Sequence, residues 1–282
     1  MIFIADFFAN QILGGGELNN EELITILIAD GHEVVKKNSH LITTEFIKKN
    51  RDGKFIVANF IGLTEACKQA LYDKDYIIYE HDHKYLAMRD PAIYENFKAP
   101  PEHIINYDFY KKAKSVLCQS TFHKEIVEKN LSLDNINSLG GNLWDIGSLQ
   151  KMREMSLVDK KETCSIMDSS VAHKNTADAV KYCRFKKLKY ELIRDTNYYS
   201  FLERLGANNK FIFFPKTPET LSRVAVEARM MNMRVVTNNL VGATHEGWFR
   251  LKGEPLIDLM HLKRKEIPQK VIEIFDEDIT NP

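Results

Sequence analysis

Short apolar runs alternate with segments of helical periodicity along the whole chain. The apolar runs are bounded by polar, glycine or proline residues, as is typical of strands buried in a parallel sheet. The segments between them place apolar residues three and four positions apart, as on the buried face of a helix. Strands are expected at residues 1–5, 32–35, 54–58, 76–79, 115–119, 163–167, 188–193, 210–214 and 234–237. This alternation predicts an α/β fold in which helices connect parallel strands.

Helices are expected at residues 17–30, 63–72, 121–130, 176–183, 198–205, 220–231 and 268–275. The first follows a glycine-rich turn at residues 14–17 and ends before Gly31, a common C-terminal stop. Its core face is expected to consist of Leu18, Leu23, Ile24, Leu27 and Ile28. Its solvent face is expected to consist of Asn19, Asn20 and Glu21. The turn lacks the G-x-G-x-x-G spacing at the usual distance from a strand, so a dinucleotide fingerprint is not predicted.

The series of strands and helices occurs twice, which predicts two Rossmann-like domains with a cleft between them. The first domain is expected at residues 1–145 and the second at residues 146–282. Residues 149–162 are rich in charge and are expected to form a linker or a surface helix.

Residues 210–242 are predicted to form a strand, a loop, a helix and a strand, the unit in which ligands bind beyond the strand ends. The helix N-terminus is expected to present the unpaired N–H groups of Thr220, Leu221 and Ser222, a site that favours an anion such as phosphate. Glu227 follows Glu219 by eight positions. If Glu219 lies in the entry loop, both carboxylates can border one cleft. The spacing alone favours two solvated carboxylates, which are common in helices.

The sequence around these glutamates, P-x-x-P-E-x7-E-A-R, resembles the E-x7-E signature of retaining glycosyltransferases of the GT-B fold, family four. The early segments LGGGE and GHEV and the later segment INSLGGNLWD resemble the first turn, the second strand and the interdomain segment of the same family. The resemblance covers nearly the whole chain. It departs after Glu219, where the family usually has Gly-Phe-Gly and this chain has Thr220-Leu221-Ser222.

The resemblance implies roles for the residues of this stretch. In the family, the first glutamate of the motif lies against the donor sugar and the second binds the nucleotide ribose; these are Glu219 and Glu227 here. Further donor contacts are expected from Gly15, Gly16, Ser170, Thr220, Leu221 and Ser222.

A loop after the first strand of the second domain supplies an arginine and a lysine to the donor diphosphate in the family. Here the loop MDSSVAHKN retains Lys174, and Ser169 and Ser170 stand where the arginine is expected. Lys174 is therefore expected to carry more of the charge stabilisation, helped by Ser170. The alternative is a solvated lysine.

The strand at residues 76–79 runs into Glu80-His81-Asp82-His83. A His-x-His pair with neighbouring acids could hold a metal ion, although a polar strand end over a cleft is more common. In the family, a histidine at this strand end lies near the sugar. The matching residue is His81 or His83, and we take His81 as the candidate.

The resemblance implies an enzyme that moves a sugar from a UDP-, GDP- or ADP-linked donor to a hydroxyl of a glycan or another acceptor. The resemblance implies a hexosyltransferase that retains the anomeric configuration. Its catalytic residues would be Glu219, Lys174 and His81, with no metal and no cofactor besides the donor. One alternative is a non-catalytic module of the same fold that binds sugar nucleotides or glycans. Another is a phage-type transferase that modifies DNA bases.

Composition adds limits to these readings. Lys plus Arg and Asp plus Glu both total 39, and a formal net charge of zero argues against a general affinity for nucleic acid. The four cysteines are far apart and form no CxxC pair, so neither a zinc ribbon nor a redox motif is predicted. The sequence shows no basic leader and no apolar run of membrane-spanning length, so a cytoplasmic protein is expected.

Overall fold

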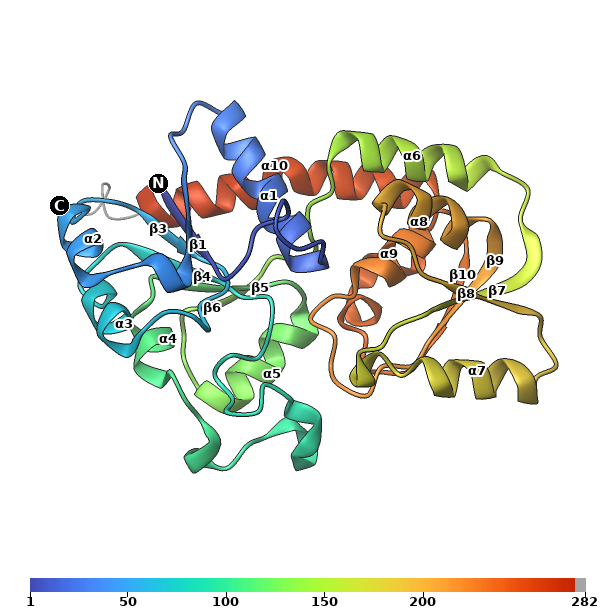
Figure 1. Ribbon diagram of the computed structural model, residues 1–282, viewed down its shortest axis with the longest axis horizontal. Helices are drawn as coiled ribbons and strands as arrows, with labels where there is room; N and C mark the ends of the chain where they lie inside the picture. Colours follow the sequence, from blue (N-terminus) through green and yellow to red (C-terminus); the bar gives the residue numbers. More distant parts are fainter. Residues whose placement is uncertain (277–282) are drawn as a thin grey trace. The chain divides into compact units, whose positions relative to one another are not determined.

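The computed structural model describes residues 1–276 and has the predicted α/β architecture (Figure 1). The chain divides into two compact units. Unit 1 consists of residues 1–139 together with the chain from Lys263 onward, and unit 2 consists of Gly140–Leu262. The predicted domains, 1–145 and 146–282, place the division a few residues later and assign the C-terminal segment to the second domain. Residues 277–282 of that prediction lie outside the described residues.

Unit 1 contains a parallel six-stranded sheet with the strand order β2-β1-β3-β4-β5-β6. The strands are β1 (Ile2–Ala5), β2 (Val35–Asn38), β3 (Phe55–Val57), β4 (Tyr76–Tyr79), β5 (Ser115–Cys118) and β6 (Ile136–Ser138). Ile4 of β1 lies opposite Lys37 in one ladder and opposite Val57 in the other. The strand order therefore reverses at β1, and α/β folds bind ligands beyond the carboxyl ends of strands at such a point.

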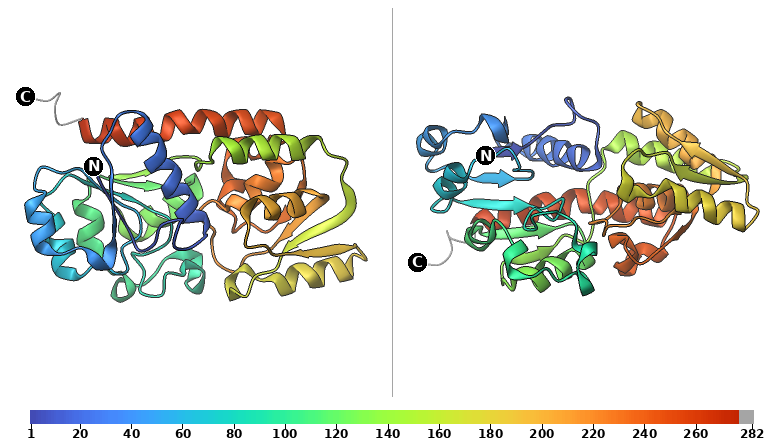
Figure 2. Two further views of the ribbon diagram at one scale, coloured as in Figure 1. Left: turned by 45° about the horizontal axis from the view of Figure 1, so that its top comes forward. Right: turned by 60° about the horizontal axis from the view of Figure 1, so that its bottom comes forward.

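Helices cover both faces of this sheet. Before unit 2 they are α1 (Gly15–Ala29), α2 (Thr44–Lys49), α3 (Glu65–Leu71), α4 (Tyr107–Lys112) and α5 (Thr121–Leu131). α1 lies on one side of the sheet together with the C-terminal part of α10 (Glu254–Asp276), and α3 and α5 lie on the other side (Figure 1, Figure 2). Arg264 of α10 pairs with Glu22 of α1, and Lys54 pairs with Asp276 over 2.6 Å. The end of the chain thus covers sheet surface on the side of α1.

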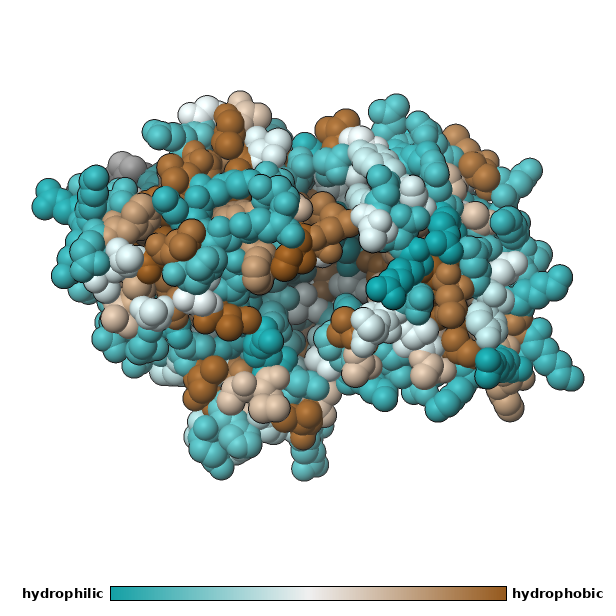
Figure 3. All heavy atoms as spheres, viewed as in Figure 1, coloured by the Kyte–Doolittle hydropathy of each residue, from teal (hydrophilic) through white to brown (hydrophobic). Residues whose placement is uncertain are grey.

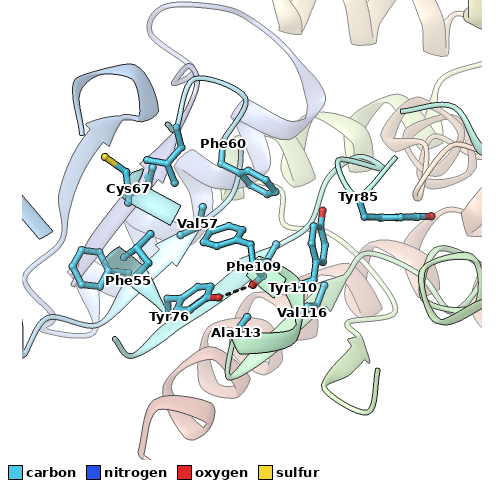
Figure 4. Close-up of a cluster of buried hydrophobic side chains, with 14 of the residues drawn as sticks. Phe55, Val57, Phe60, Cys67, Tyr76, Tyr85, Phe109, Tyr110, Ala113 and Val116 are labelled. Carbon is cyan, nitrogen blue, oxygen red and sulfur yellow. Dashed lines mark hydrogen bonds between the residues drawn. The ribbon is translucent and has the colours of Figure 1, made fainter. Parts of the chain in front are cut away.

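Aromatic side chains fill much of the core of unit 1 (Figure 4). Tyr76 of β4 stacks on Phe109 of α4 with the ring centroids 5.0 Å apart, and its hydroxyl donates to the Phe109 carbonyl oxygen over 2.5 Å. Phe60 meets the Phe109 ring edge-on. Because the buried hydroxyl of Tyr76 has a partner, this cluster gains apolar burial without an unsatisfied polar group.

Unit 2 contains a parallel four-stranded sheet with the strand order β10-β9-β7-β8. The strands are β7 (Lys161–Met167), β8 (Tyr190–Ile193), β9 (Asn208–Phe213) and β10 (Arg234–Thr237). The helices before α10 are α6 (Ile146–Leu157), α7 (Thr176–Phe185), α8 (Tyr198–Gly206) and α9 (Arg223–Met230). α7 lies on one side of the sheet, and α8 and α9 lie on the other (Figure 1, Figure 2). β7 pairs with both β8 and β9, so the strand order of this sheet reverses at β7.

The second strand begins later than predicted. β2 starts at Val35, whereas the sequence pattern placed the strand at residues 32–35. Gly31 has a φ of +90°, and the N–H of His32 donates back to the Leu27 carbonyl oxygen over 3.0 Å. These contacts finish the end of α1, so the residues directly after the glycine belong to the helix cap and not to the strand.

The last helix begins much earlier than predicted. The pattern took Pro268 as the first residue of a helix, but α10 starts at Glu254 and continues through Pro268. Leu256 and Met260 pack into the core of unit 2, and Val271 is fully buried in the part of the helix that belongs to unit 1. The apolar residues before the proline therefore form a second buried stripe that the prediction missed.

Of the two alternatives for residues 149–162, a linker or a surface helix, the structure shows a helix, although one of its faces is buried. α6 occupies most of this segment, and its residues Leu149 and Met152 are buried in the core of unit 2.

On the molecular surface, hydrophilic side chains dominate the face shown in Figure 3, with apolar side chains in small groups among them. Within residues 1–276 no helix combines the length and the apolar character needed to cross a membrane.

Candidate functional site

Two loops meet at the carboxyl edge of the sheet in unit 2, because β7 and β9 are paired at the reversal point. The loop after β7 contains the short 3-10 turn Ala172–Lys174, and the loop after β9 contains Glu219. The N–H of Lys216 donates to the His173 carbonyl oxygen over 2.8 Å and ties the loops together. This edge therefore gathers residues that are far apart in the sequence.

Lys174 and Glu219 form an ion pair at this edge. Nζ of Lys174 lies 2.7 Å from Oε1 and 2.8 Å from Oε2 of Glu219. The lysine side chain is 28% exposed and the glutamate side chain 12%. The ammonium also lies 5.9 Å from the centre of the Phe213 ring. The structure thus brings together two predicted catalytic residues in partial shelter from water, where charges interact more strongly than on an open surface.

Glu219 lies in extended chain and not in a helix. Its N–H donates to the Leu240 carbonyl oxygen over 2.7 Å, and its carbonyl oxygen accepts from the N–H of Gly242 over 2.9 Å. This parallel bridge holds the chain extended past Glu219, and α9 begins only at Arg223. The predicted helix start at Thr220 is therefore wrong, and the location of Glu219 in the entry loop agrees with the condition for a shared site with Glu227.

Two of the three residues after Glu219 are buried and help to hold the loop in place. Leu221 is fully buried in the core of unit 2, and its carbonyl oxygen accepts from the N–H of Ala243 over 2.9 Å. Ser222 is also buried, has a φ of 72°, and its hydroxyl has no hydrogen-bond partner in the described part of the chain. Donor binding by Thr220, Leu221 and Ser222 stays a prediction, as it does for the exposed Ser170.

Glu227 is almost completely buried, with 2% of the residue exposed. Its Oε1 accepts a hydrogen bond from Trp144 Nε1 over 2.9 Å and another from the Tyr198 hydroxyl over 2.6 Å. Nε of Arg223 lies 3.5 Å from the same oxygen. Burial, with the nearby charge of Glu227, raises the pKa of Tyr198 well above its ordinary value, so this hydroxyl stays a donor.

Sequence reasoning does not identify Trp144, Tyr198 or Arg223 as site residues. Arg223 precedes Glu227 by four positions, the spacing of an ion pair on one helix face, so the sequence contained an indication for this residue. Trp144 and Tyr198 lie 83 and 29 positions from Glu227. Their contacts depend on tertiary packing that no local pattern reveals.

In unit 1 the start of α1 lies against the end of β4. A Cβ atom on Gly16 would lie 3.7 Å from the His81 ring. Nε2 of His81 lies 2.5 Å from Oδ1 of Asn20, and its Nδ1 is hydrogen-bonded to the side-chain amide of Gln119. The structure therefore places His81 beside the first turn of α1, which contains Gly15 and Gly16.

The same network corrects the predicted faces of α1. Asn19 and Asn20 are fully buried, although they were expected to face solvent, and Ile28 is 52% exposed, although it was expected in the core. Asn19 donates to the Tyr79 hydroxyl over 2.7 Å, and Asn20 pairs with His81. The Asn19 amide and the Asn20 carbonyl oxygen have these polar partners at the strand end, whereas Nδ2 of Asn20 is buried without a hydrogen-bond partner in the described part of the chain.

The structure separates the two histidines that the sequence left open. His81 is partly exposed beside the glycine turn, whereas His83 is 2% exposed and lies 3.0 Å from the Tyr85 hydroxyl through Nδ1. His81 is the more accessible of the two histidines, and its role near a sugar stays a prediction. Within residues 1–276, no group of three or more His, Cys, Asp and Glu side chains is placed to hold a metal ion.

Asp6, directly after β1, is a site-edge residue that sequence reasoning missed. Its carboxylate accepts hydrogen bonds from the N–H groups of Ile61 and Gly62 over 3.1 and 2.9 Å and from the Ser39 hydroxyl. It therefore ties together the loops after the first three strands. Burial raises the pKa of Glu17, and the nearby Asp6 charge raises it further. An acid directly after the apolar run MIFIA was the available indication.

The site residues form two groups. Lys174, Glu219 and Glu227 lie in unit 2, whereas His81 and the turn with Gly15 and Gly16 lie in unit 1. Each group is built within its own unit, and their binding of one common ligand stays a prediction.

Comparisons with known proteins bear on the fold. No family model matches the sequence, and no curated protein matches it either. One similar solved structure is an α-glucosyltransferase in complex with UDP and a 13-mer DNA containing an HMU base. It is 11% identical, with a TM-score of 0.50, and the alignment covers 98% of this chain and 94% of that chain.

A second similar structure is Anabaena Alr3699/HepE in complex with UDP and glucose. It is 12% identical, with a TM-score of 0.51, and the alignment covers 99% of this chain and 97% of that chain. At such identities the likeness shows the fold, and the predicted GT-B arrangement of two Rossmann-like units is confirmed. The assignment to family four and the reading of the E-x7-E motif stay predictions.

Proposed function

We propose that this protein is a glycosyltransferase that moves a sugar from a nucleotide sugar to an acceptor hydroxyl. The observation that carries the proposal is the ion pair of Lys174 and Glu219 at the carboxyl edge of the sheet in unit 2. The two similar structures contain UDP, and one of them also contains glucose. The proposed donor is accordingly a UDP-, GDP- or ADP-linked sugar.

Lys174 is proposed to stabilise the leaving group. Transfer breaks the bond between the anomeric carbon and the phosphate oxygen, and the bonding electrons stay on the diphosphate. An ammonium group that is already held in place by Glu219 can meet this growing negative charge without reorganisation. Ser169 and Ser170 replace the second cation of the family pattern, so Lys174 carries most of this stabilisation.

The two glutamates are proposed to hold the other parts of the donor. Glu219 keeps one side exposed at the edge and can accept hydrogen bonds from sugar hydroxyls while it orients Lys174. Glu227 is proposed to bind the ribose, because a buried carboxylate with an unfilled oxygen is stabilised by a ligand hydroxyl. Within unit 1, His81 is proposed to contact a sugar.

Transfer is proposed to proceed with retention and without a metal ion. The acceptor oxygen bonds to the anomeric carbon on the face from which the diphosphate leaves, and the acceptor proton passes to the departing phosphate oxygen. Metal independence is supported by the sequence, which has no Asp-x-Asp pair in a loop that follows a strand. In this proposal Lys174 and the backbone at the strand ends neutralise the diphosphate instead.

A thermal-shift series with UDP-, GDP- and ADP-sugars, followed by transfer from the radiolabelled donor, tests the proposal. A donor that binds the folded state raises the melting temperature, and labelled product should form equally with EDTA and with manganese. Activity that EDTA abolishes and manganese restores would overturn the metal-free mechanism. No stabilisation by any donor would overturn the function.

A non-catalytic sugar-nucleotide module is the main alternative, and the same assay recognises it. The loop after Glu219 lacks the glycines of the family pattern, which is the observation in its favour. Such a module would be stabilised by the donor but would neither transfer nor hydrolyse it.

A hydroxyl on a modified DNA base is a second candidate acceptor. The observation that favours it is the similar α-glucosyltransferase structure, which contains DNA with an HMU base. The formal net charge of zero counts against it, because DNA binding draws most of its affinity from phosphate contacts. Transfer to hydroxymethylated DNA, compared with transfer to free oligosaccharides, separates the two acceptors.

A further inference from the structure

The Glu227 carboxylate is held on one side only. Trp144 Nε1 and the Tyr198 hydroxyl both donate to Oε1, over 2.9 and 2.6 Å. A carboxylate oxygen has two lone pairs, so these two donors fill the acceptor capacity of Oε1. Within residues 1–276, no group donates to Oε2 of Glu227. This oxygen is not completely buried, although only 2% of the residue is exposed.

Arg223 holds this arrangement together. Its guanidinium lies over the Trp144 ring at 4.5 Å from the ring centre, and its Nη1 donates to the Leu143 carbonyl oxygen. Nη2 lies 3.5 Å from the Tyr198 hydroxyl, and Nε lies 3.5 Å from Oε1 of Glu227. The cation therefore contacts both donors and lies beside the buried charge of Glu227.

We propose that Trp144 and Tyr198 are positioning residues that turn Glu227 so that Oε2 alone meets the nucleotide. The inference rests on the proposed function, in which Glu227 binds the ribose. It adds that the two ribose hydroxyls are not equivalent. One donates to Oε2, and the other finds Oε1 already occupied.

The consequence is a preference that nucleotide analogues can measure. Loss of the hydroxyl that meets Oε2 removes a hydrogen bond to a charged acceptor and leaves that oxygen without a partner. Such a loss is expected to weaken binding by about tenfold or more. Loss of the other hydroxyl is expected to change the affinity by less than about twofold, since no carboxylate bond is lost.

The experiment is titration calorimetry on the whole protein. UDP, GDP and ADP are titrated first, and the 2′-deoxy and 3′-deoxy analogues of the tightest binder follow. The wild-type protein should discriminate between the two analogues by about tenfold or more. The Tyr198→Phe and Trp144→Phe variants each remove one donor; the first keeps the phenyl ring, and the second replaces the indole by a smaller aromatic ring. Because Oε1 then regains a lone pair, their discrimination between the analogues should fall to within about twofold.

Tyr199→Phe is the matched control. Tyr199 is the neighbouring tyrosine, it is 45% exposed, and its hydroxyl lies 3.5 Å from Oδ1 of Asp145 instead of Glu227. This variant should keep the wild-type discrimination. A merely structural role of Tyr198 would lower the affinity for all analogues alike and leave their ratio unchanged.

The outcomes separate the inference from the proposed function. Nucleotide binding with equal losses for both deoxy analogues in the wild-type protein would overturn the inference alone, as would an unchanged ratio in both the Tyr198→Phe and the Trp144→Phe variant. A wild-type protein that binds none of the three nucleotides would overturn the proposed function and the inference with it. The wild-type comparison stands even where a variant does not fold.

Discussion

Glu80 and Glu227 both have buried carboxylates. The hydrogen-bond partners of each carboxylate distinguish a structural residue from a candidate binding residue. Glu80 is fully buried, with Lys84 Nζ at 2.8 Å from Oε1 and the Tyr110 hydroxyl donating to Oε2. Burial nevertheless raises its pKa. Both oxygens of Glu80 accept hydrogen bonds from within the protein. Glu227 has one filled oxygen and one open oxygen, which is the arrangement expected of a binding residue.

At the residue scale, the sequence supports the choice of Glu219, Glu227, Lys174 and His81 as candidates through motif resemblance, while it does not indicate their partners. Trp144 and Tyr198 reach Glu227 across 83 and 29 positions, and only packing brings them there. Asn20 was expected on a solvent face because a periodicity rule assigns polar residues to the outside. That rule fails where a buried polar group has a partner such as His81.

His123 makes a prediction about acid stability. It is fully buried on α5, and burial lowers its pKa well below the ordinary value of 6.5, with His83 lowering it further. Below about pH 6.5 the histidine binds a proton in the unfolded chain but stays neutral in the folded protein. The free energy of unfolding therefore decreases as the pH falls below this value. The loss from this group is expected to be up to about 1.4 kcal/mol per pH unit.

Denaturant unfolding of the wild-type protein and the His123→Gln variant at pH 7.5 and pH 5.5 measures this loss. The variant should lose less unfolding free energy between the two pH values than the wild-type protein does. His245→Gln, at an exposed position, is the control and should follow the wild-type protein. Identical losses for His123→Gln and the wild-type protein would show that His123 does not stay neutral.

At the element scale, the loop from Glu219 to Ser222 decides the geometry of the site. The bridge to Val241 keeps Glu219 extended, and Ser222 then turns the chain into α9 with a φ of 72°. The sequence predicted the helix and the strands on both sides, since they follow from apolar periodicity. It could not predict the loop conformation, because the bridge depends on chain that returns about twenty residues later, after β10.

Ser222→Gly is expected to stabilise the protein. A side chain at a left-handed position costs roughly 1–2 kcal/mol, and glycine relieves this strain while it adds freedom to the unfolded chain. The expected net gain in unfolding free energy is up to about 1 kcal/mol. Ser200→Gly, within the helix α8, should instead lower it by roughly 0.5–1 kcal/mol. Thermal unfolding of both variants checks this, and a loss in Ser222→Gly equal to that of Ser200→Gly would contradict it.

At the scale of the whole molecule, the C-terminal part of the chain, from Lys263 onward, belongs to unit 1. The sequence predicted two units of parallel strands and helices, and the fold comparison agrees. It did not predict that residues from Lys263 onward belong to unit 1, because contiguity along the chain favours one cut between two domains. The polar contacts of this segment include the pair of Arg264 with Glu22 and the bond from Lys270 to the Ser138 carbonyl oxygen.

Two isoleucines on α10 test this division. Ile257 and Ile267 are both 1% exposed, but they belong to unit 2 and unit 1 respectively. Each change to alanine is expected to cost about 2–5 kcal/mol, because it removes buried methyl groups and leaves a cavity. Hydrogen exchange should then speed up in β9 and β10 for Ile257→Ala and in β3 and β4 for Ile267→Ala. Leu262→Ala, at a side chain that is 56% exposed, is the control. The same exchange pattern in both core variants would contradict the division.

The edge with Lys174 and Glu219 is proposed to be a site of sugar transfer. The transfer rates of two variants test this role most directly. Lys174→Ala removes the cation that faces the leaving diphosphate, so turnover should fall by about 10²–10³ while donor affinity changes much less. Glu219→Gln keeps the size of the side chain and removes its charge. It should lower the transfer rate and leave the affinity for the bare nucleoside diphosphate nearly intact.

Lys181→Ala is the matched control, because this lysine pairs with Asp178 on α7 and its side chain is 77% exposed. Transfer rates and nucleotide affinities of the three variants are measured side by side with the wild-type protein, with the donor selected by thermal shift. We expect Lys174→Ala to lower turnover and Glu219→Gln to lower the transfer rate without weakening nucleotide affinity. Lys181→Ala should keep the wild-type rate. Wild-type rates in both Lys174→Ala and Glu219→Gln would contradict a site of sugar transfer. They would show that this ion pair only holds two loops together.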